Sequence, residues 1–217
     1  MVLMKKEKLK KLLTKVFLKY KLSKEHAKIC SDALVNAELV GATGHGVSRL
    51  KMYCDRINKK LINPKPKFKF KKISQSIMQI DADDSIGFVA ADIGIKKAIE
   101  NAKKTGFGLV GIKRSGHYGL SGYYAEQAVK KKLLTLIFTN APPAIAPHGA
   151  LKTLFGTNPI CFGTPTSSKV PFILDTSVSM INRGKIRVAA RTGTKIPEGV
   201  ALDKYGRPTT DAAKALK

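Results

Sequence analysis

The stretch that decides the fold is Arg114-Ser115-Gly116-His117-Tyr118-Gly119-Leu120-Ser121-Gly122-Tyr123-Tyr124. It follows an apolar run, Leu109 to Ile112, that predicts a buried strand, and it precedes a helical pattern from Tyr123 to Lys132. A glycine-rich turn between a strand and a helix directs backbone N–H groups and the positive end of the helix dipole at one point, which suits an anionic group. His117 adds a titratable group to this turn. A tight turn with a surface histidine explains the same residues, and the residues alone leave both interpretations open.

The chain before this stretch carries apolar side chains at helical spacing. One stripe consists of Leu9, Leu12, Leu13, Val16, Phe17 and Tyr20. Ser23 is a good N-cap for a second helix that Gly41 ends, and a third helix is expected from Val47 to Asn58. Pro64 to Lys72 predicts a linker or an edge strand. We therefore expect residues 1–72 to form a helical subdomain with a linker.

From Ile73 onward the pattern changes to short apolar runs that alternate with helical segments. Strands are expected at residues 77–81, 107–113, 133–139, 160–164 and 171–176, and helices at residues 88–105 and 178–191. The stretch after Thr192 is rich in turns. The pattern predicts the α/β class, with the helical subdomain followed by a mixed α/β domain over residues 73–217.

One glycine motif needs a separate interpretation. Gly106-Phe107-Gly108-Leu109-Val110-Gly111 matches GxGxxG, which in a Rossmann domain follows a strand and opens a helix. Here the motif follows a helix and enters a strand. We therefore interpret it as a helix stop followed by a strand entry.

Length, apolar runs and cysteine spacing indicate which class of protein this sequence belongs to. The length of 217 residues suits one sizeable domain, or one domain with a small appendage, and there is no apolar run long enough to span a bilayer. The segment from Met1 to Lys11 lacks the apolar core of a signal peptide. Cys30, Cys54 and Cys161 are widely spaced and form no CxxC pair. This pattern predicts reduced thiols in a cytoplasmic protein, with no disulfide framework and no zinc site.

The net charge of +25 raises the question of a polyanionic partner. From Met1 to Lys72 the chain has 20 Lys or Arg against 5 Asp or Glu. Nearly all are lysines, whereas readers of base sequence favour arginine and binders of single strands interleave aromatic residues. Only Phe68 and Phe70 are interleaved here. The pattern favours a solvated lysine surface over a nucleic-acid interface.

His45 and Arg49 form a second candidate site. His45 lies between two glycines in Thr43-Gly44-His45-Gly46, at the expected start of a helix. Arg49 follows four residues later and shares a side with His45 if the helix begins early. A guanidinium can bind a carboxylate with two hydrogen bonds while an imidazole protonates a neighbouring carbonyl oxygen, which suits a 2-oxo acid. An N-terminal turn with an incidental His–Arg pair remains the alternative.

Three blocks together resemble the malate/L-lactate dehydrogenase-like family of NAD(P)-dependent oxidoreductases. They are Gly44–Leu50; Ser115–Gly119 with Gly122–Ala125; and Thr139–Pro142 with Ala146–Gly149 and Gly156–Pro159. Further matches lie at Phe172–Ser177, Arg183–Ile186, Ile196–Gly199, Ala201–Lys204 and Gly206–Asp211. Each block alone is weak, but their order and spacing are those of the family.

The resemblance implies a non-Rossmann nicotinamide-binding domain beside a helical one, usually in a homodimer. It implies that His45 exchanges the proton and that Arg49 binds the carboxylate of the acid, with Thr157 touching substrate. The same comparison gives His117 as the catalytic base of the ureidoglycolate branch. The cofactor contacts that it implies, for NAD or NADP, are His117, Tyr118, Gly119, Leu120, Ser121, Asn140, Asp175, Thr176 and Ser177.

Two departures from the family pattern qualify this expectation. Gly44 stands where many members have a hydroxyl residue near the catalytic histidine, and members continue well beyond the position of Lys217. We expect an oxidoreductase that moves a hydride between NAD(P) and a small 2-hydroxy or 2-oxo acid, such as malate, lactate or ureidoglycolate. The alternative is a truncated, non-catalytic remnant whose basic surface binds polyanions. The sequence leaves the acid and the choice between NAD and NADP open.

Overall fold

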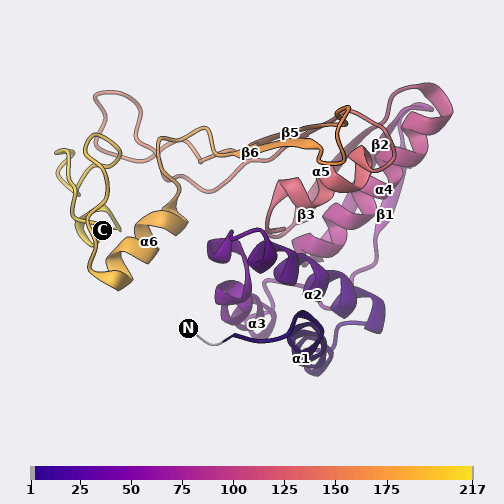
Figure 1. The fold of residues 1–217 in the computed structure, drawn as a ribbon, viewed down its shortest axis with the longest axis horizontal. Helices are drawn as coiled ribbons and strands as arrows, with labels where there is room; N and C mark the ends of the chain where they lie inside the picture. Colours follow the sequence, from indigo (N-terminus) through magenta and orange to yellow (C-terminus); the bar gives the residue numbers. More distant parts are fainter. Residues whose placement is uncertain (1–2, 217) are drawn as a thin grey trace. The chain divides into compact units, whose positions relative to one another are not determined.

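The computed structural model describes residues 3–216, traced in Figure 1 from indigo at the N-terminus to yellow at the C-terminus. In chain order the elements are α1 (Lys6–Lys19), α2 (Lys24–Leu39), η1 (Thr43–His45), η2 (Val47–Arg49), α3 (Leu50–Asn58), β1 (Lys69–Lys72), β2 (Ile77–Ser85), α4 (Gly87–Thr105), β3 (Leu109–Ser115), α5 (Ser121–Val129), β4 (Thr135–Phe138), β5 (Ile160–Thr164), β6 (Phe172–Thr176), α6 (Arg183–Thr192) and η3 (Lys214–Leu216). The predicted α/β class, with helices first and a mixed sheet after them, is confirmed.

The helices α1 and α2 follow the predicted apolar spacing. Leu13 and Phe17 of α1 are buried, as the stripe requires. Ser23 is the N-cap of α2, and its side-chain oxygen accepts a hydrogen bond of 3.1 Å from the backbone N–H of His26. Gly41 follows the end of α2 with a φ of 76°, in the left-handed region that favours glycine.

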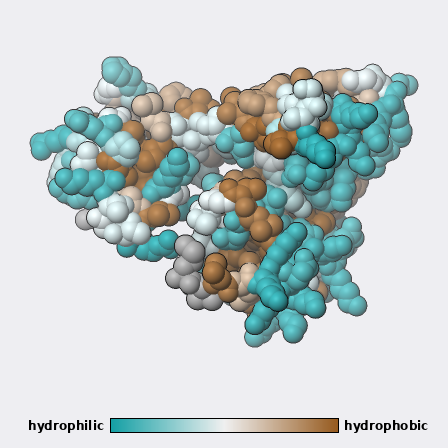
Figure 2. Space-filling model, viewed as in Figure 1, coloured by the Kyte–Doolittle hydropathy of each residue, from teal (hydrophilic) through white to brown (hydrophobic). Residues whose placement is uncertain are grey.

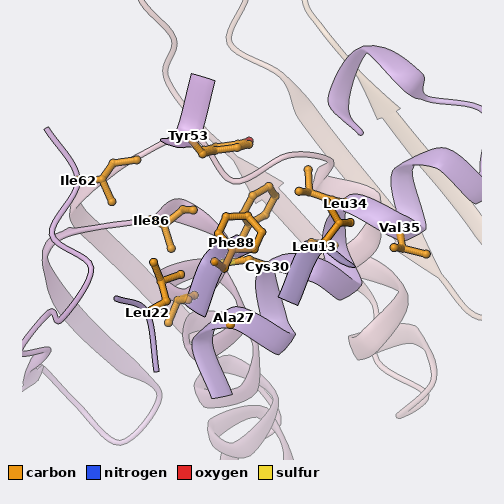
Figure 3. Packing of buried hydrophobic residues seen from close by; sticks show 13 residues of the cluster. Leu13, Leu22, Ala27, Cys30, Leu34, Val35, Tyr53, Ile62, Ile86 and Phe88 are labelled. Atoms are coloured by element: carbon orange, nitrogen blue, oxygen red, sulfur yellow. The ribbon is translucent and has the colours of Figure 1, made fainter. Parts of the chain in front are cut away.

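The main core joins the first helices to α4. The rings of Tyr53 (α3) and Phe88 (α4) lie 4.9 Å apart between centroids, and both side chains are completely buried. Figure 3 shows these residues among apolar side chains of α1 and α2, Leu13 and Leu34 among them. Burial of each large apolar side chain contributes roughly 1.5–3 kcal/mol. The cluster therefore holds α3 in a fixed position against α4.

The first sheet has the strand order β1-β2-β3, with β1 antiparallel and β3 parallel to β2. α4 packs so closely on β3 that a Cβ at Gly94 would lie 2.6 Å from Cδ1 of Ile112. The prediction of a buried strand at Leu109–Ile112 was wrong, because Leu109 is 46% exposed and Ile112 is 37% exposed. Among the described strands β3 pairs with β2 alone, so it is an edge strand.

The segment that contains the GxGxxG match behaves as predicted. Gly106 ends α4 in the left-handed conformation, with a φ of 79°, and its N–H donates to the Ala102 carbonyl oxygen at 2.8 Å. Gly108 then passes α4 so closely that a Cβ there would collide with the carbonyl oxygen of Ala98. The match is therefore a helix stop and a strand entry.

The second sheet has the strand order β4-β5-β6, and β5 has the predicted bounds. The predicted helix over residues 178–191 was wrong at its start, because α6 begins only at Arg183. Asn182 caps α6, since its side-chain oxygen accepts a 2.9 Å hydrogen bond from the N–H of Lys185. The Ser179 hydroxyl donates to the Ile181 carbonyl oxygen at 3.0 Å, a local bond that competes with helix formation.

The chain divides into two compact units. The first unit comprises Met1–Thr135 and Gly163–Phe172, and the second comprises Leu136–Phe162 and Ile173–Lys217. The helical segment and the first sheet therefore belong to one unit. A domain boundary at residue 72 stays a prediction, and residues 1–2 and 217 of the predicted domains lie outside the described residues.

The surface carries many hydrophilic side chains. Figure 2 shows them over the region of α1 and over the region of β1, β2 and α4. Cys30, Cys54 and Cys161 are free and buried. Among the described residues, no helix combines the length and the apolar composition that a membrane crossing requires.

Candidate active site

His45 ends a short 3-10 turn rather than starting a helix. Thr43–His45 forms η1, and Gly46 separates it from η2 with a φ of −91° and a ψ of −141°. A Cβ at Gly46 would collide with the side chain of Glu38, whose Oε1 accepts a 2.7 Å hydrogen bond from the N–H of Val47. Glu38 therefore anchors the turn at the start of η2, and the predicted helix over 47–58 has a 3-10 first turn.

Arg49 reaches the histidine turn through a side-chain bond. Its Nε–H donates to the carbonyl oxygen of Gly44 at 2.7 Å. Gly46 interrupts the helix, so the i, i+4 relation that the sequence allows is absent. The hydrogen bond to Gly44 instead ties the guanidinium to the turn that ends in His45.

The second turn carries His117 between β3 and α5. Gly119 has a φ of 82°, and a Cβ there would lie 2.7 Å from Cε1 of Phe88. Glycine is therefore required by packing on α4 as well as by backbone conformation. The Tyr118 and Ser121 hydroxyls are 2.9 Å apart, and α5 begins at Ser121, before the predicted start at Tyr123.

Tyr53 connects the two turns to the core. Its hydroxyl lies 2.6 Å from Nδ1 of His117, and the N–H of Gly119 donates to the same nitrogen at 3.3 Å. The imidazole rings of His45 and His117 are stacked, with centroids 5.9 Å apart and an interplanar angle of 12°. The structure thus brings together His45, Arg49 and His117, all within the first compact unit.

The electrostatic setting favours a neutral His117. Burial, first, and then the neighbouring positive charges of His45, Arg49 and Arg56 together lower the pKa of His117 to about 4. Burial also raises the pKa of Tyr53, so its hydroxyl keeps its proton. At neutral pH the pair consists of a phenol and an uncharged imidazole.

The remaining predicted site residues lie in the second unit. They are Asn140, Thr157, Asp175, Thr176 and Ser177. Within this unit the N–H of Val178 donates to the carbonyl oxygen of Thr157 at 3.0 Å, which places Thr157 beside the end of β6. The Asn158 side-chain oxygen accepts a 3.0 Å hydrogen bond from the N–H of Ala141, next to Asn140. These residues form a second group, within the second unit.

The sequence interpretation missed Tyr53. Its signal was available, because Tyr53 follows Arg49 by four residues and Arg56 follows Tyr53 by three on a predicted helix. The Tyr53 hydroxyl contacts His117, and the charges of Arg49 and Arg56 lie near enough to lower the pKa of His117. A tyrosine at helical spacing is usually interpreted as a core side chain, so the sequence did not predict that the Tyr53 hydroxyl bonds His117.

The residues around α5 fit a dinucleotide. Leu120 is the N-cap of α5, and the positive end of the helix dipole at this point favours a negatively charged group such as a phosphate. The Tyr118 and Ser121 hydroxyls lie beside this helix end. Within residues 3–216 no cluster of His, Cys, Asp or Glu side chains has the arrangement to hold a metal ion.

Comparison with known proteins gives relatives over nearly the whole chain. L-sulfolactate dehydrogenase from Methanocaldococcus jannaschii is 41% identical over 216 residues, which are 100% of this chain and 62% of that protein. The crystal structure of malate dehydrogenase from Entamoeba histolytica superposes with a TM-score of 0.94 and 32% identity, over 98% of this chain and 59% of that one.

Two further relatives have a nicotinamide cofactor in their names. Ureidoglycolate dehydrogenase (NAD(+)) from Escherichia coli is 33% identical, over 88% of this chain and 54% of that protein. (2R)-3-sulfolactate dehydrogenase (NADP(+)) from Chromohalobacter salexigens is 37% identical, over 88% of this chain and 57% of that protein. The chain therefore spans 54 to 62% of the length of these relatives. A model of the malate/L-lactate dehydrogenase family matches residues 4–217, and the chain belongs to this family.

Proposed function

We propose that the protein to which this chain belongs is an oxidoreductase that moves a hydride between NAD(P) and C2 of a small 2-hydroxy or 2-oxo acid. The relatives named for malate, sulfolactate and ureidoglycolate support this class of substrate. The single observation that carries the proposal is the stack of His45 on His117 with Arg49 tied to the same turn. When bound, the nicotinamide supplies or accepts the hydride.

His45 exchanges the proton with the C2 oxygen. It lies on a turn that is anchored by Glu38, and its stacked partner His117 stays uncharged near neutral pH. An imidazole with a pKa near the working pH is well suited to general acid–base catalysis. Gly44 has no side chain to relay the proton, so His45 exchanges it with the acid directly or with solvent.

Arg49 binds the carboxylate of the acid. Its Nε–H bond to Gly44 holds the planar guanidinium beside His45, which orients the acid so that C2 lies near the imidazole. The family resemblance also implies Thr157 as a substrate contact.

The cofactor contacts that we propose for the first unit are His117, Tyr118, Gly119, Leu120 and Ser121, which precede or begin α5. The family resemblance also implies Asn140, Asp175, Thr176 and Ser177 as cofactor contacts. The relatives with NAD(+) and NADP(+) in their names support either nicotinamide dinucleotide. We further propose that the active form is a homodimer and that it is cytoplasmic. Light scattering measures the molar mass and so tests the homodimer.

The proposal is tested by binding and by turnover. Reduced NAD and NADP are titrated into the chain by cofactor fluorescence, and a panel of malate, lactate, sulfolactate and ureidoglycolate is then screened with each oxidised cofactor. We expect binding of at least one cofactor and turnover with at least one acid. If neither cofactor binds and no acid is oxidised, the chain is a remnant without catalysis, and the lysine surface is then its remaining functional feature.

A further inference from the structure

The hydrogen bonds at His117 determine which of its nitrogens carries the proton. A backbone N–H can only donate, so the 3.3 Å bond from Gly119 makes Nδ1 of His117 an acceptor. The Tyr53 hydroxyl lies 2.6 Å from the same atom. Within residues 3–216 this hydroxyl has no other hydrogen-bond partner. Because a buried hydroxyl needs an acceptor for its proton, Tyr53 donates to Nδ1.

Two donors that converge on Nδ1 leave the ring proton on Nε2. No hydrogen bond to Nε2 is present within the described residues, and no buried side-chain nitrogen or oxygen there lacks a partner. Nε2 is therefore not fully buried. An Nε2–H group donates a hydrogen bond and has no lone pair with which to accept a proton.

We propose that Tyr53 is a positioning residue that, together with the Gly119 N–H, holds His117 in the neutral tautomer protonated at Nε2. His117 is then a hydrogen-bond donor to the bound ligand and not a general base. This division of roles leaves proton exchange to His45, and that last step rests on the proposed function. The tautomer itself does not, because it follows from contacts within the first unit.

Protonation of Nδ1 would disrupt this arrangement. It would set a ring N–H against the N–H of Gly119, and the Tyr53 hydroxyl would have to turn its proton away from its acceptor. Rotation of the phenol is restricted because Tyr53 is completely buried and packs on Phe88. The core that holds α3 against α4 therefore also selects the histidine tautomer.

Nitrogen NMR of the chain labelled with ¹⁵N in its histidine rings tests the tautomer directly. There are four histidines, and the His117 signals are assigned by their loss in His117→Asn. We expect the wild-type chain at neutral pH to show a deprotonated-type Nδ1 and a protonated-type Nε2 for His117. A protonated Nδ1 in the wild type would overturn the proposal, whatever the activity of the chain.

Tyr53→Phe isolates the hydroxyl, because it retains the buried ring. A hydrogen bond of ordinary strength predicts a roughly threefold to tenfold fall in the ratio of the Nε2–H to the Nδ1–H tautomer, with the shifts of both nitrogens moving toward each other. Tyr20→Phe is the matched control, since its hydroxyl bonds Cys54 and packs on the same core. Unchanged His117 shifts in Tyr53→Phe, or equal shifts in both variants, would remove the positioning role.

Turnover distinguishes this proposal from the proposed function. If the tautomer is as expected and the chain binds cofactor, Tyr53→Phe should lower kcat or raise KM by about tenfold or less, while Tyr20→Phe behaves as wild type. A chain with the expected tautomer but without cofactor binding would contradict the dehydrogenase proposal and leave the role of Tyr53 intact.

Discussion

The imidazole rings of His45 and His117 are stacked, with centroids 5.9 Å apart and 12° between their planes. Burial, first, and then the charges of His45, Arg49 and Arg56 lower the pKa of His117 to about 4, so His117 is uncharged near neutral pH. Each of the predictions below tests a contact or a charged group of this structure.

The first prediction concerns stability against pH. The pKa of His117 is about 4 when folded and about 6.5 when unfolded, so the unfolded chain binds more protons between these values. Stability should therefore rise with pH across this window and fall on acidification, by at most about 3 kcal/mol from this group. Urea unfolding from pH 4 to 7 measures it. In His117→Asn, whose side-chain oxygen can still accept from Tyr53, this slope should shrink; an unchanged slope would contradict the assignment.

The second prediction concerns the proton. His45→Gln should lower kcat by about 10² to 10⁴-fold, the range typical of a lost acid–base group, while cofactor affinity stays near that of the wild type. Steady-state kinetics and fluorescence titration measure the two effects. Near-normal turnover would exclude His45 from the chemistry. His26→Gln is the control, since His26 lies at the start of α2 beside Phe68.

The third prediction concerns the carboxylate. Arg49→Lys should raise KM for the acid by roughly tenfold to a hundredfold, because a point charge replaces a planar, two-pronged donor. Arg56→Lys is the matched control, because Arg56 lies in α3 and its charge, like that of Arg49, lowers the pKa of His117. A larger effect at Arg56 than at Arg49 would reverse their assigned roles.

The fourth prediction concerns Gly119. Gly119→Ala places a methyl group 2.7 Å from Phe88 at a φ of 82°, so it combines backbone strain with a clash. Gly41→Ala has a φ of 76° and no atom within 4 Å of the added methyl group, so it carries the strain alone. We expect about 1–2 kcal/mol of destabilisation for Gly41→Ala and about 1–3 kcal/mol more for Gly119→Ala. Equal urea midpoints for the two variants would contradict the packing of Gly119 on Phe88.

The fifth prediction concerns Arg114, whose guanidinium contacts Asp81, Asp83 and Asp84 at 3.2, 3.0 and 2.7 Å. Arg114→Leu would leave three carboxylates facing one another beside a bulged strand. The variant should unfold at lower urea, and added salt should recover part of the loss by screening. Lys104→Leu, which removes a partner of Glu100 alone, should show a smaller loss. Absence of any salt effect would contradict the electrostatic cause.

The sequence by itself determined the local features of this protein. Helical spacing and the Ser23 cap predicted α1 and α2, and Gly106 predicted the end of α4, because spacing, caps and left-handed glycines act within a few residues. The glycine-flanked turn of His45 was equally visible, since glycine and a polar ring stand next to each other in the chain. The family blocks predicted the dehydrogenase class, which the family match confirms.

Only the tertiary structure decided which distant groups meet. The Tyr53 hydroxyl reaches Nδ1 of His117 because α3 packs on α4 through Phe88, and no local pattern encodes the direction of a phenol on a buried helix face. The exposure of Leu109 to Ile112 depends on what covers β3, and hydrophobic composition alone predicted burial. α6 starts late because Asn182, and not one of the serines before it, is the N-cap residue of this helix. Contacts of this kind are cooperative properties of the packed chain, so the histidine tautomer and the neutral charge of His117 are set by the fold rather than by the residues that carry the chemistry.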